Sequence, residues 1–220
     1  MKQKFTILFD LDGTLVDTAP DLMLAHNHVM KKFGYPTKST EDIRNLVGKG
    51  AGALIGRSIW GQAKKEFSKV LDEKIKDEMV KEFVNFYGKN IVNESTLVTG
   101  VKDFLIWCKE QNISMAVCTN KQEHLSNDLL KKIGIYDFFE YVAGSDTFDY
   151  CKPDPRHLTN VVEILDGDVK KSIMIGDSET DANAAKAAEI PVILLENGYT
   201  EKNTTEIYHN HLIKDFIGIE

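Results

Sequence analysis

The chain of 220 residues is long enough for one α/β domain with an insert, or for two small domains. Apolar residues make up 42% and charged residues 28%, which is typical of a globular protein. The formal net charge of -7 argues against nonspecific binding to nucleic acid or to an anionic membrane, so we expect neither as a partner.

The apolar run near the N-terminus is short. Thr6–Phe9 is followed at once by Asp10, which comes too early for the hydrophobic region of a signal peptide. No stretch approaches the roughly 20 apolar residues of a membrane span. The cysteines Cys108, Cys118 and Cys151 are odd in number and lack a CxxC spacing, which favours free thiols in a reducing compartment. We therefore expect a cytoplasmic protein that does not act at a membrane.

Short apolar runs alternate with helical patterns along the chain. The predicted buried strands are Thr6–Phe9, Ser114–Cys118, Glu140–Ala143, Ile173–Ile175 and Val192–Leu195. The predicted helices between them cover Leu125–Ile133 with a stop at Gly134, Leu158–Leu165, and the alanine-rich Thr180–Glu189. This alternation predicts an α/β fold, a Rossmann-like doubly wound parallel sheet with helices on both faces.

Residues 18–88 differ from the rest because they carry helical signals and no clear strand. Within them, Lys64–Tyr87 places charged residues on one helical face and large apolar residues on the other. This predicts an α-helical cap domain inserted into a core formed by residues 1–17 and 89–220. Asp17 is expected to cap or precede the first cap helix. Since ligands of open parallel sheets bind at the carboxyl ends of strands, the insert is placed to act as a lid.

Four polar motifs follow predicted strands. They are D-x-D-G-T at Asp10–Thr14, a hydroxyl and an amide at Thr119–Asn120, a lysine at Lys152–Pro153, and G-D-x-x-x-D at Gly176–Asp181. Each motif alone has an ordinary explanation as a solvated turn or a helix start. D-x-D-G-T, however, arises by chance in only about one such chain in a thousand. Because the other motifs follow it in order at strand ends, we expect one shared site.

The spacing of these residues brings carboxylates together. Asp10 and Asp12 lie two positions apart and face the same way in extended backbone, while Asp181 lies about one helical turn after Asp177. Such a cluster needs a cation, and an all-oxygen set suits Mg²⁺. The cation and Lys152 together can neutralise a phosphoryl group. A metal-bound Asp can then attack phosphorus and form an aspartyl-phosphate, with a second carboxyl carrying the proton.

Over residues 9–195 these motifs resemble the haloacid dehalogenase-like phosphohydrolases. The resemblance implies that Asp10 is the nucleophile and Asp12 the general acid and base. The dehalogenase branch, which attacks carbon, lacks an acid at the position of Asp12. The pumping ATPases of the superfamily carry a lysine where this chain has Leu11. The resemblance therefore favours hydrolysis or transfer of a phosphate ester.

The same resemblance implies roles for the remaining polar residues of the motifs. Thr119 and Asn120 would bind the phosphoryl group, and Lys152 would stabilise both the nucleophile and the phosphate. The implied Mg²⁺ site consists of Asp10, the backbone carbonyl of Asp12, and Asp177. Asp181 belongs to the same metal site and would support the ion from behind its direct ligands or through Lys152. The helical insert resembles the α-helical cap of the first type in this superfamily.

Arg44–Ile55 is the most distinctive stretch of the predicted cap. Two glycines, one of them Gly50, flank Lys49 just before a helix, where free backbone N–H groups favour anions. The stretch is either a glycine-rich turn with a solvated lysine or an anion site. In the second case Lys49, with Gly50, or Arg57 would bind a carboxylate of the substrate. This Val-Gly-x-Gly segment and residues 197–199 resemble segments of phosphoglycolate phosphatases.

The sequence thus predicts a Mg²⁺-dependent phosphatase for a small anionic phosphomonoester, with 2-phosphoglycolate implied by the resemblance. Within the fold, the alternative is a phosphosugar phosphatase or a β-phosphoglucomutase-like phosphotransferase. A phosphonoacetaldehyde hydrolase would use Lys49 for a Schiff base, but Asp12 already has a role in ester hydrolysis. A binding protein that only shares the fold would lack a core group, yet all are present. Monomer and homodimer both remain open.

Overall fold

The structure is a computed structural model that describes residues 4–66 and 73–219. Among these residues, one six-stranded sheet has the order β5-β4-β1-β6-β7-β8, and every neighbouring pair is parallel. Its strands are β1 (Thr6–Phe9), β4 (Ser114–Cys118), β5 (Tyr141–Ala143), β6 (Ser172–Gly176), β7 (Val192–Leu195) and β8 (His211–Ile213). The parallel sheet confirms the predicted α/β class.

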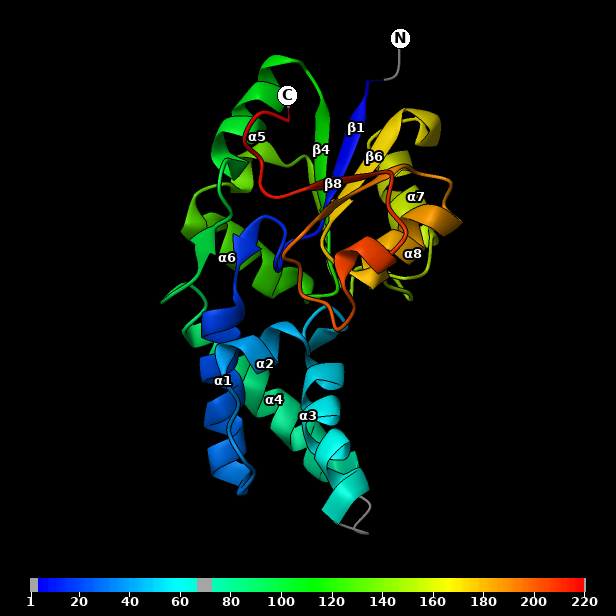
Figure 1. Cartoon of the computed structure of the whole chain (residues 1–220). Helices are drawn as coiled ribbons and strands as arrows, with labels where there is room; N and C mark the ends of the chain where they lie inside the picture. Colours follow the sequence, from blue (N-terminus) through cyan, green and yellow to red (C-terminus); the bar gives the residue numbers. More distant parts are fainter. Residues whose placement is uncertain (1–3, 67–72, 220) are drawn as a thin grey trace.

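Helices cover both faces of this sheet. They are α5 (Val101–Glu110), α6 (Glu123–Ile133), α7 (Arg156–Ile164) and α8 (Glu179–Ala187). Successive strand residues point to opposite faces. Ile7 and Phe9 accordingly share an apolar cluster with α5 and α6, whereas Leu8 packs with α7 and α8. Figure 1 shows these two pairs of helices on opposite sides of the sheet. The fold is therefore doubly wound.

A second group of helices lies beyond one end of the sheet, in the lower half of Figure 1. These helices are α1 (Ala19–Phe33), α2 (Thr40–Arg44), α3 (Gly50–Glu66) and α4 (Glu73–Lys89). Helix α1 packs against α2 and α4, and α3 packs against α4. A two-stranded antiparallel ribbon, β2 (Val16–Asp17) with β3 (Thr96–Leu97), carries both connections between these helices and the sheet.

The amphipathic pattern of Lys64–Tyr87 is borne out in part. Met79 and Phe83 of α4 are buried, but Ile75 is exposed. Phe86 is half-buried, and the other apolar positions of the predicted face, Phe67, Val70 and Leu71, lie outside the described residues. Across residues 4–66 and 73–219, no helix is long and apolar enough to cross a membrane.

All five predicted strands are present, and their ends agree within one residue. The sequence did not predict β2, β3 or β8, because β2 and β3 have two residues each and β8 contains only two apolar residues. The helix after residue 122 stops at Gly134 as predicted, with that glycine in the left-handed conformation at φ 81°.

Asp17 precedes α1 but does not cap it. The residue at the cap position is Thr18, and its side chain forms no capping bond. The backbone N–H of Ala19 donates instead to the Tyr199 hydroxyl at 2.9 Å, so a distant residue satisfies the helix end. The Asp17 carboxylate accepts hydrogen bonds from Tyr199 and from Arg44 of α2.

Candidate active site

Asp10 and Asp12 follow β1 directly. The Asp10 N–H donates to the carbonyl of Ile175 in β6 at 2.9 Å, so the β-ladder holds this residue at the strand end. Gly13 then turns the chain at φ 84°, and a Cβ there would lie 2.2 Å from a carboxylate oxygen of Asp177. Only glycine tolerates both this φ and this contact. The turn therefore brings the D-x-D-G motif against the loop after β6.

Three buried carboxylates converge at this point. One oxygen each of Asp10, Asp177 and Asp181 lies within 4.8 Å of the others. Lys152 Nζ donates to Asp10 at 2.9 Å and to Asp181 at 2.6 Å. Burial raises the pKa of Asp10 to about 6, with Lys152 opposing and Asp181 reinforcing this shift. Burial and the charge of Asp10 likewise raise the pKa of Asp177.

The ends of β6 and α8 place the two later carboxylates. Asp181 accepts from the backbone N–H of Ser178 at 3.0 Å and from its hydroxyl at 2.7 Å, which forms a capping box at the start of α8. Asp177 accepts from the backbone N–H of Tyr199 at 2.6 Å and from the Thr14 hydroxyl at 3.3 Å. Both side chains are thus held by hydrogen bonds of the protein itself.

Asp12 faces a different lysine. Lys121 Nζ lies 2.8 Å from both carboxylate oxygens of Asp12, and the Thr18 hydroxyl donates to the same carboxylate at 2.7 Å. Asp12 is not among the three clustered carboxylates. The two acidic residues of the motif therefore have different partners, Lys152 for Asp10 and Lys121 for Asp12.

Thr119 and Asn120 follow β4. Thr119 is buried and lies in the wall of the same pocket as Asp10 and Asp12. The Asn120 amide nitrogen donates to the carbonyl of Gly48 at 3.1 Å and to that of Lys152 at 2.9 Å. Asn120 therefore ties the glycine-rich turn between α2 and α3 to the loop that carries Lys152.

The donor set fits a divalent cation. Four carboxylates, those of Asp10, Asp12, Asp177 and Asp181, face two ammonium groups, which leaves two negative charges in formal excess. Buried charges need compensation. Oxygen atoms are the ligands that Mg²⁺ prefers. Asp10, Asp177 and Asp181 could hold such an ion through their clustered carboxylate oxygens.

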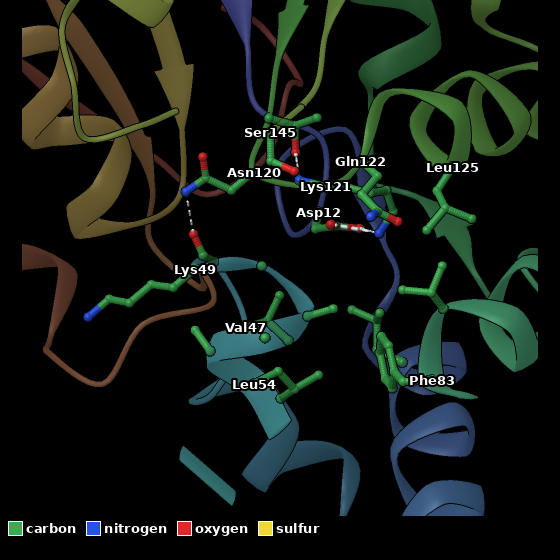
Figure 2. A pocket seen from close by; sticks show the side chains of 18 of the residues that line it. Asp12, Val47, Lys49, Leu54, Phe83, Asn120, Lys121, Gln122, Leu125 and Ser145 are labelled. Atoms are coloured by element: carbon green, nitrogen blue, oxygen red, sulfur yellow. Dashed lines mark hydrogen bonds and ion pairs between the residues drawn. The ribbon is translucent and has the colours of Figure 1, made fainter. Parts of the chain in front are cut away.

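A pocket of about 300 Å³ opens beside Asp10 and Asp12. Its opposite wall comes from α3, α4 and the turn before α3, and is largely apolar (Figure 2). The apolar residues of this wall include Val47, Leu54, Val80, Phe83 and Val84. The helices at the end of the sheet therefore provide one side of the pocket, and the strand ends provide the other.

The structure separates the residues of the predicted cap site. Lys49 and Gly50 line the pocket with Asp10. Arg57 is not in that lining: it donates to the carbonyls of Asn45 and Leu46 and pairs with Glu201. These contacts hold Arg57 on another side of α3, away from Asp12.

Sequence reasoning missed Lys121, Tyr199 and Tyr87. A signal for Lys121 was present, because it lies two residues after Thr119 in Thr-Asn-Lys, and alternate residues of an extended chain share a side. No local pattern predicts the contacts of Tyr199 and Tyr87, which reach Asp177 and Lys121 from distant segments. Such contacts depend on the tertiary fold.

Comparison with known proteins agrees with this geometry. The model of the haloacid dehalogenase-like hydrolase family matches residues 7–195. The chain belongs to this family.

The relatives of this chain indicate which kind of hydrolase it is. The phosphoglycolate phosphatase of Mesorhizobium japonicum is 37% identical over 96% of this chain and 90% of its own length. That of Caulobacter vibrioides is 38% identical over 97% and 88%. The crystal structure of a protein described as a predicted phosphoglycolate phosphatase, from Haemophilus somnus, superposes with a TM-score of 0.90 at 31% identity, over 98% of this chain and 96% of that one. The chain is a phosphoric monoester hydrolase similar to these proteins.

Proposed function

We propose that this protein is a Mg²⁺-dependent phosphatase that hydrolyses 2-phosphoglycolate through an aspartyl-phosphate. The observation that carries the proposal is the buried set of four carboxylates and two lysines facing a pocket of about 300 Å³. The similarity to phosphoglycolate phosphatases over nearly the whole chain supports the choice of substrate.

Asp10, Asp177 and Asp181 would hold the metal, with the Asp12 backbone carbonyl as a further ligand. When bound, the ion supplies positive charge that favours ionised carboxylates and offsets the charge of a phosphate. Lys152 contacts both Asp10 and Asp181 and adds a second, fixed positive charge at the same place. Thr119 and Asn120 are proposed to hold the phosphoryl group from the end of β4.

The reaction takes place in two steps. In the first, a carboxylate oxygen of Asp10 forms a bond to phosphorus, the ester P–O bond breaks, and Asp12 gives its proton to the leaving oxygen. In the second, Asp12 removes a proton from water, whose oxygen attacks phosphorus. The bond between phosphorus and the Asp10 oxygen breaks, phosphate leaves, and Asp10 is regenerated as a carboxylate.

We assign residues 18–88 to a cap domain and residues 1–17 and 89–220 to the core. The ribbon of β2 and β3 carries both connections, which suits a movable cap. Water excluded by the closed cap would strengthen the interactions of the phosphate with charged groups. A cytoplasmic enzyme, monomeric or homodimeric, is part of the same proposal.

A phosphotransferase remains the second candidate. A β-phosphoglucomutase from Clostridium difficile superposes with a TM-score of 0.80, but at 22% identity this likeness concerns the fold. Both candidates share the nucleophile, so product analysis separates them. With a hexose 1-phosphate, a phosphatase releases inorganic phosphate, whereas a mutase yields the 6-phosphate.

The test is phosphate release from 2-phosphoglycolate with and without Mg²⁺, by the wild type and Asp10→Asn. We expect Mg²⁺-dependent turnover in the wild type and a loss of at least about 1,000-fold in the variant, since an amide cannot form the covalent intermediate. Asp128→Asn, an exposed change in α6, is the matched control. Equal rates for Asp10→Asn and the wild type would refute the covalent mechanism.

A further inference from the structure

The lining of the pocket contains two lysines, Lys49 and Lys121. Their ammonium groups lie in different places. In Figure 2 the Lys49 side chain leads away from Asp12, whereas a dashed contact joins Lys121 to Asp12. The Lys121 side chain is 5% exposed. Of the two, Lys121 is the cation inside the pocket.

Lys121 retains a donor for a second anion. An ammonium group has three N–H donors, and the two oxygens of Asp12 occupy two of them. Across residues 4–66 and 73–219, Asp12 is its one ion-pair partner. The third donor is therefore available to a ligand in the pocket.

Tyr87 of α4 lines the pocket beside Lys121. Lys121 Nζ lies 4.6 Å from the centroid of its ring. Tyr87 is 1% exposed, and its hydroxyl has no hydrogen-bond partner in the described part of the chain. Burial, reinforced by Asp12 and Asp21, raises the pKa of Tyr87, so the hydroxyl keeps its proton. A buried hydroxyl without a partner costs free energy that a bound acceptor would recover.

The position of Lys121 and Tyr87 relative to Asp12 indicates how far the ester oxygen lies from the negative group that they would bind in the substrate. Asp12 is the group proposed to protonate the ester oxygen. In 2-phosphoglycolate a single methylene carbon separates that oxygen from the carboxylate. A cation for the carboxylate must therefore lie next to Asp12, as Lys121 does. The distal phosphate of a phosphosugar would lie several bonds further away.

On the basis of the proposed function, we infer that Lys121 and the Tyr87 hydroxyl bind the substrate carboxylate and select phosphate esters of 2-hydroxy acids. This places carboxylate recognition at the end of β4 and on α4, not at Lys49 or Arg57 as the sequence suggested. The apolar wall that includes Leu54 keeps water away and strengthens the charge interaction.

The experiment compares kcat/KM for 2-phosphoglycolate and 2-hydroxyethyl phosphate, which carries a neutral CH₂OH in place of the carboxylate. The ratio of the two values is the selectivity. We expect Lys121→Met to lower the selectivity about 100-fold, Lys121→Arg to retain most of it, and Tyr87→Phe to lower it about 10-fold. Lys49→Met makes the same change at the other lysine and should leave the selectivity within about 3-fold of the wild type.

The outcomes separate this inference from the proposed function. Equal losses on both substrates in Lys121→Met would overturn the inference and leave the phosphatase intact. A selectivity loss in Lys49→Met alone would also overturn it. A wild type inactive on both esters would remove the proposed function and the inference together. If Lys121→Met does not fold, the selectivity of Tyr87→Phe tests the inference instead. An unchanged selectivity in Tyr87→Phe overturns the inference.

Discussion

At the scale of single residues, the site consists of charges that hold one another in place. Lys152 lies between Asp10 and Asp181, and Lys121 lies against Asp12. All of these side chains are buried or nearly so. Buried ion pairs add little net stability compared with apolar residues, but the loss of one partner is expensive. The site is therefore sensitive to any single change of charge.

Replacement of Lys152 tests this sensitivity. Lys152→Met leaves Asp10 and Asp181 without their shared cation, so we expect the free energy of unfolding in metal-free buffer to fall by about 3–5 kcal/mol. Urea denaturation measures the change. Lys170→Met, at an exposed lysine, should change it by less than about 0.5 kcal/mol. A loss below about 1 kcal/mol for Lys152→Met would contradict the prediction.

His157 predicts a dependence of stability on pH. Burial, with the charge of Lys152 nearby, lowers its pKa from 6.5 to about 4. Between these two values the unfolded chain binds a proton that the folded chain does not bind. The free energy of unfolding therefore falls as the pH drops from 6.5 to 4, by about 3 kcal/mol from this group.

Denaturation of His157→Gln at several pH values checks this sign. The variant should lose stability less steeply than the wild type over that range, because its side chain does not titrate. His124→Gln, at an exposed position in α6, serves as the control. Parallel curves for the wild type and His157→Gln would show that His157 makes no such contribution.

At the scale of elements, helix ends and short loops connect the two groups of helices. Asp21 in the first turn of α1 is buried and accepts hydrogen bonds from the segment that returns from α4. Its donors are the backbone N–H groups of Asn93 at 3.1 Å, Glu94 at 3.0 Å and Ser95 at 2.9 Å, together with the Ser95 hydroxyl at 2.6 Å. Asp21 thus fastens the outgoing and returning connections to each other.

Asp21→Ala removes the shared acceptor of these donors. We expect a loss of about 3 kcal/mol in the free energy of unfolding, since several buried or half-buried donors lose their partner. Thermal and urea denaturation measure the loss. Asp103→Ala, in the exposed first turn of α5, should cost about 0.5 kcal/mol. Equal costs for both variants would show that Asp21 does not fasten the connections.

At the scale of the whole molecule, the parallel sheet brings four loops to one edge, and the second group of helices closes over that edge. Motifs separated by more than 160 residues meet there, as the hydrogen bond from Thr14 to Asp177 shows. The excess of negative charge is a property of this assembly and of none of its parts. The folded protein, and not the unfolded chain, therefore has the carboxylate cluster that could hold a divalent cation.

Mg²⁺ should therefore stabilise the folded protein. At free Mg²⁺ 100-fold above its Kd, binding contributes about 2.7 kcal/mol, which for a chain of this size raises Tm by about 5–10 °C. Differential scanning calorimetry with and without the ion measures the shift. Asp177→Asn should abolish most of the shift and Asp128→Asn should retain it. A full shift in Asp177→Asn would place the cation elsewhere.

Much of the fold was predictable because it depends on local periodicity. The five predicted sheet strands and the helix stop at Gly134 follow from apolar runs and a left-handed glycine. The short strands β2, β3 and β8 were not predictable, because their pairing partners define them. The same applies to the start of α1: Asp17 precedes this helix as expected, but the contact to its first N–H comes from Tyr199, 182 positions after Asp17.

The sequence by itself determined the α/β class and the order of Asp10, Asp12, Thr119, Lys152 and the later acidic pair, because these lie within short motifs at strand ends. Only the tertiary structure decided which lysine faces which carboxylate, and which cation the pocket encloses. Nothing in the sequence alone distinguishes the charge of Lys49 from that of Lys121. Their surroundings differ because helix α4 and the end of β4 enclose Lys121 against Asp12 and Tyr87, and burial is a property of the folded chain alone.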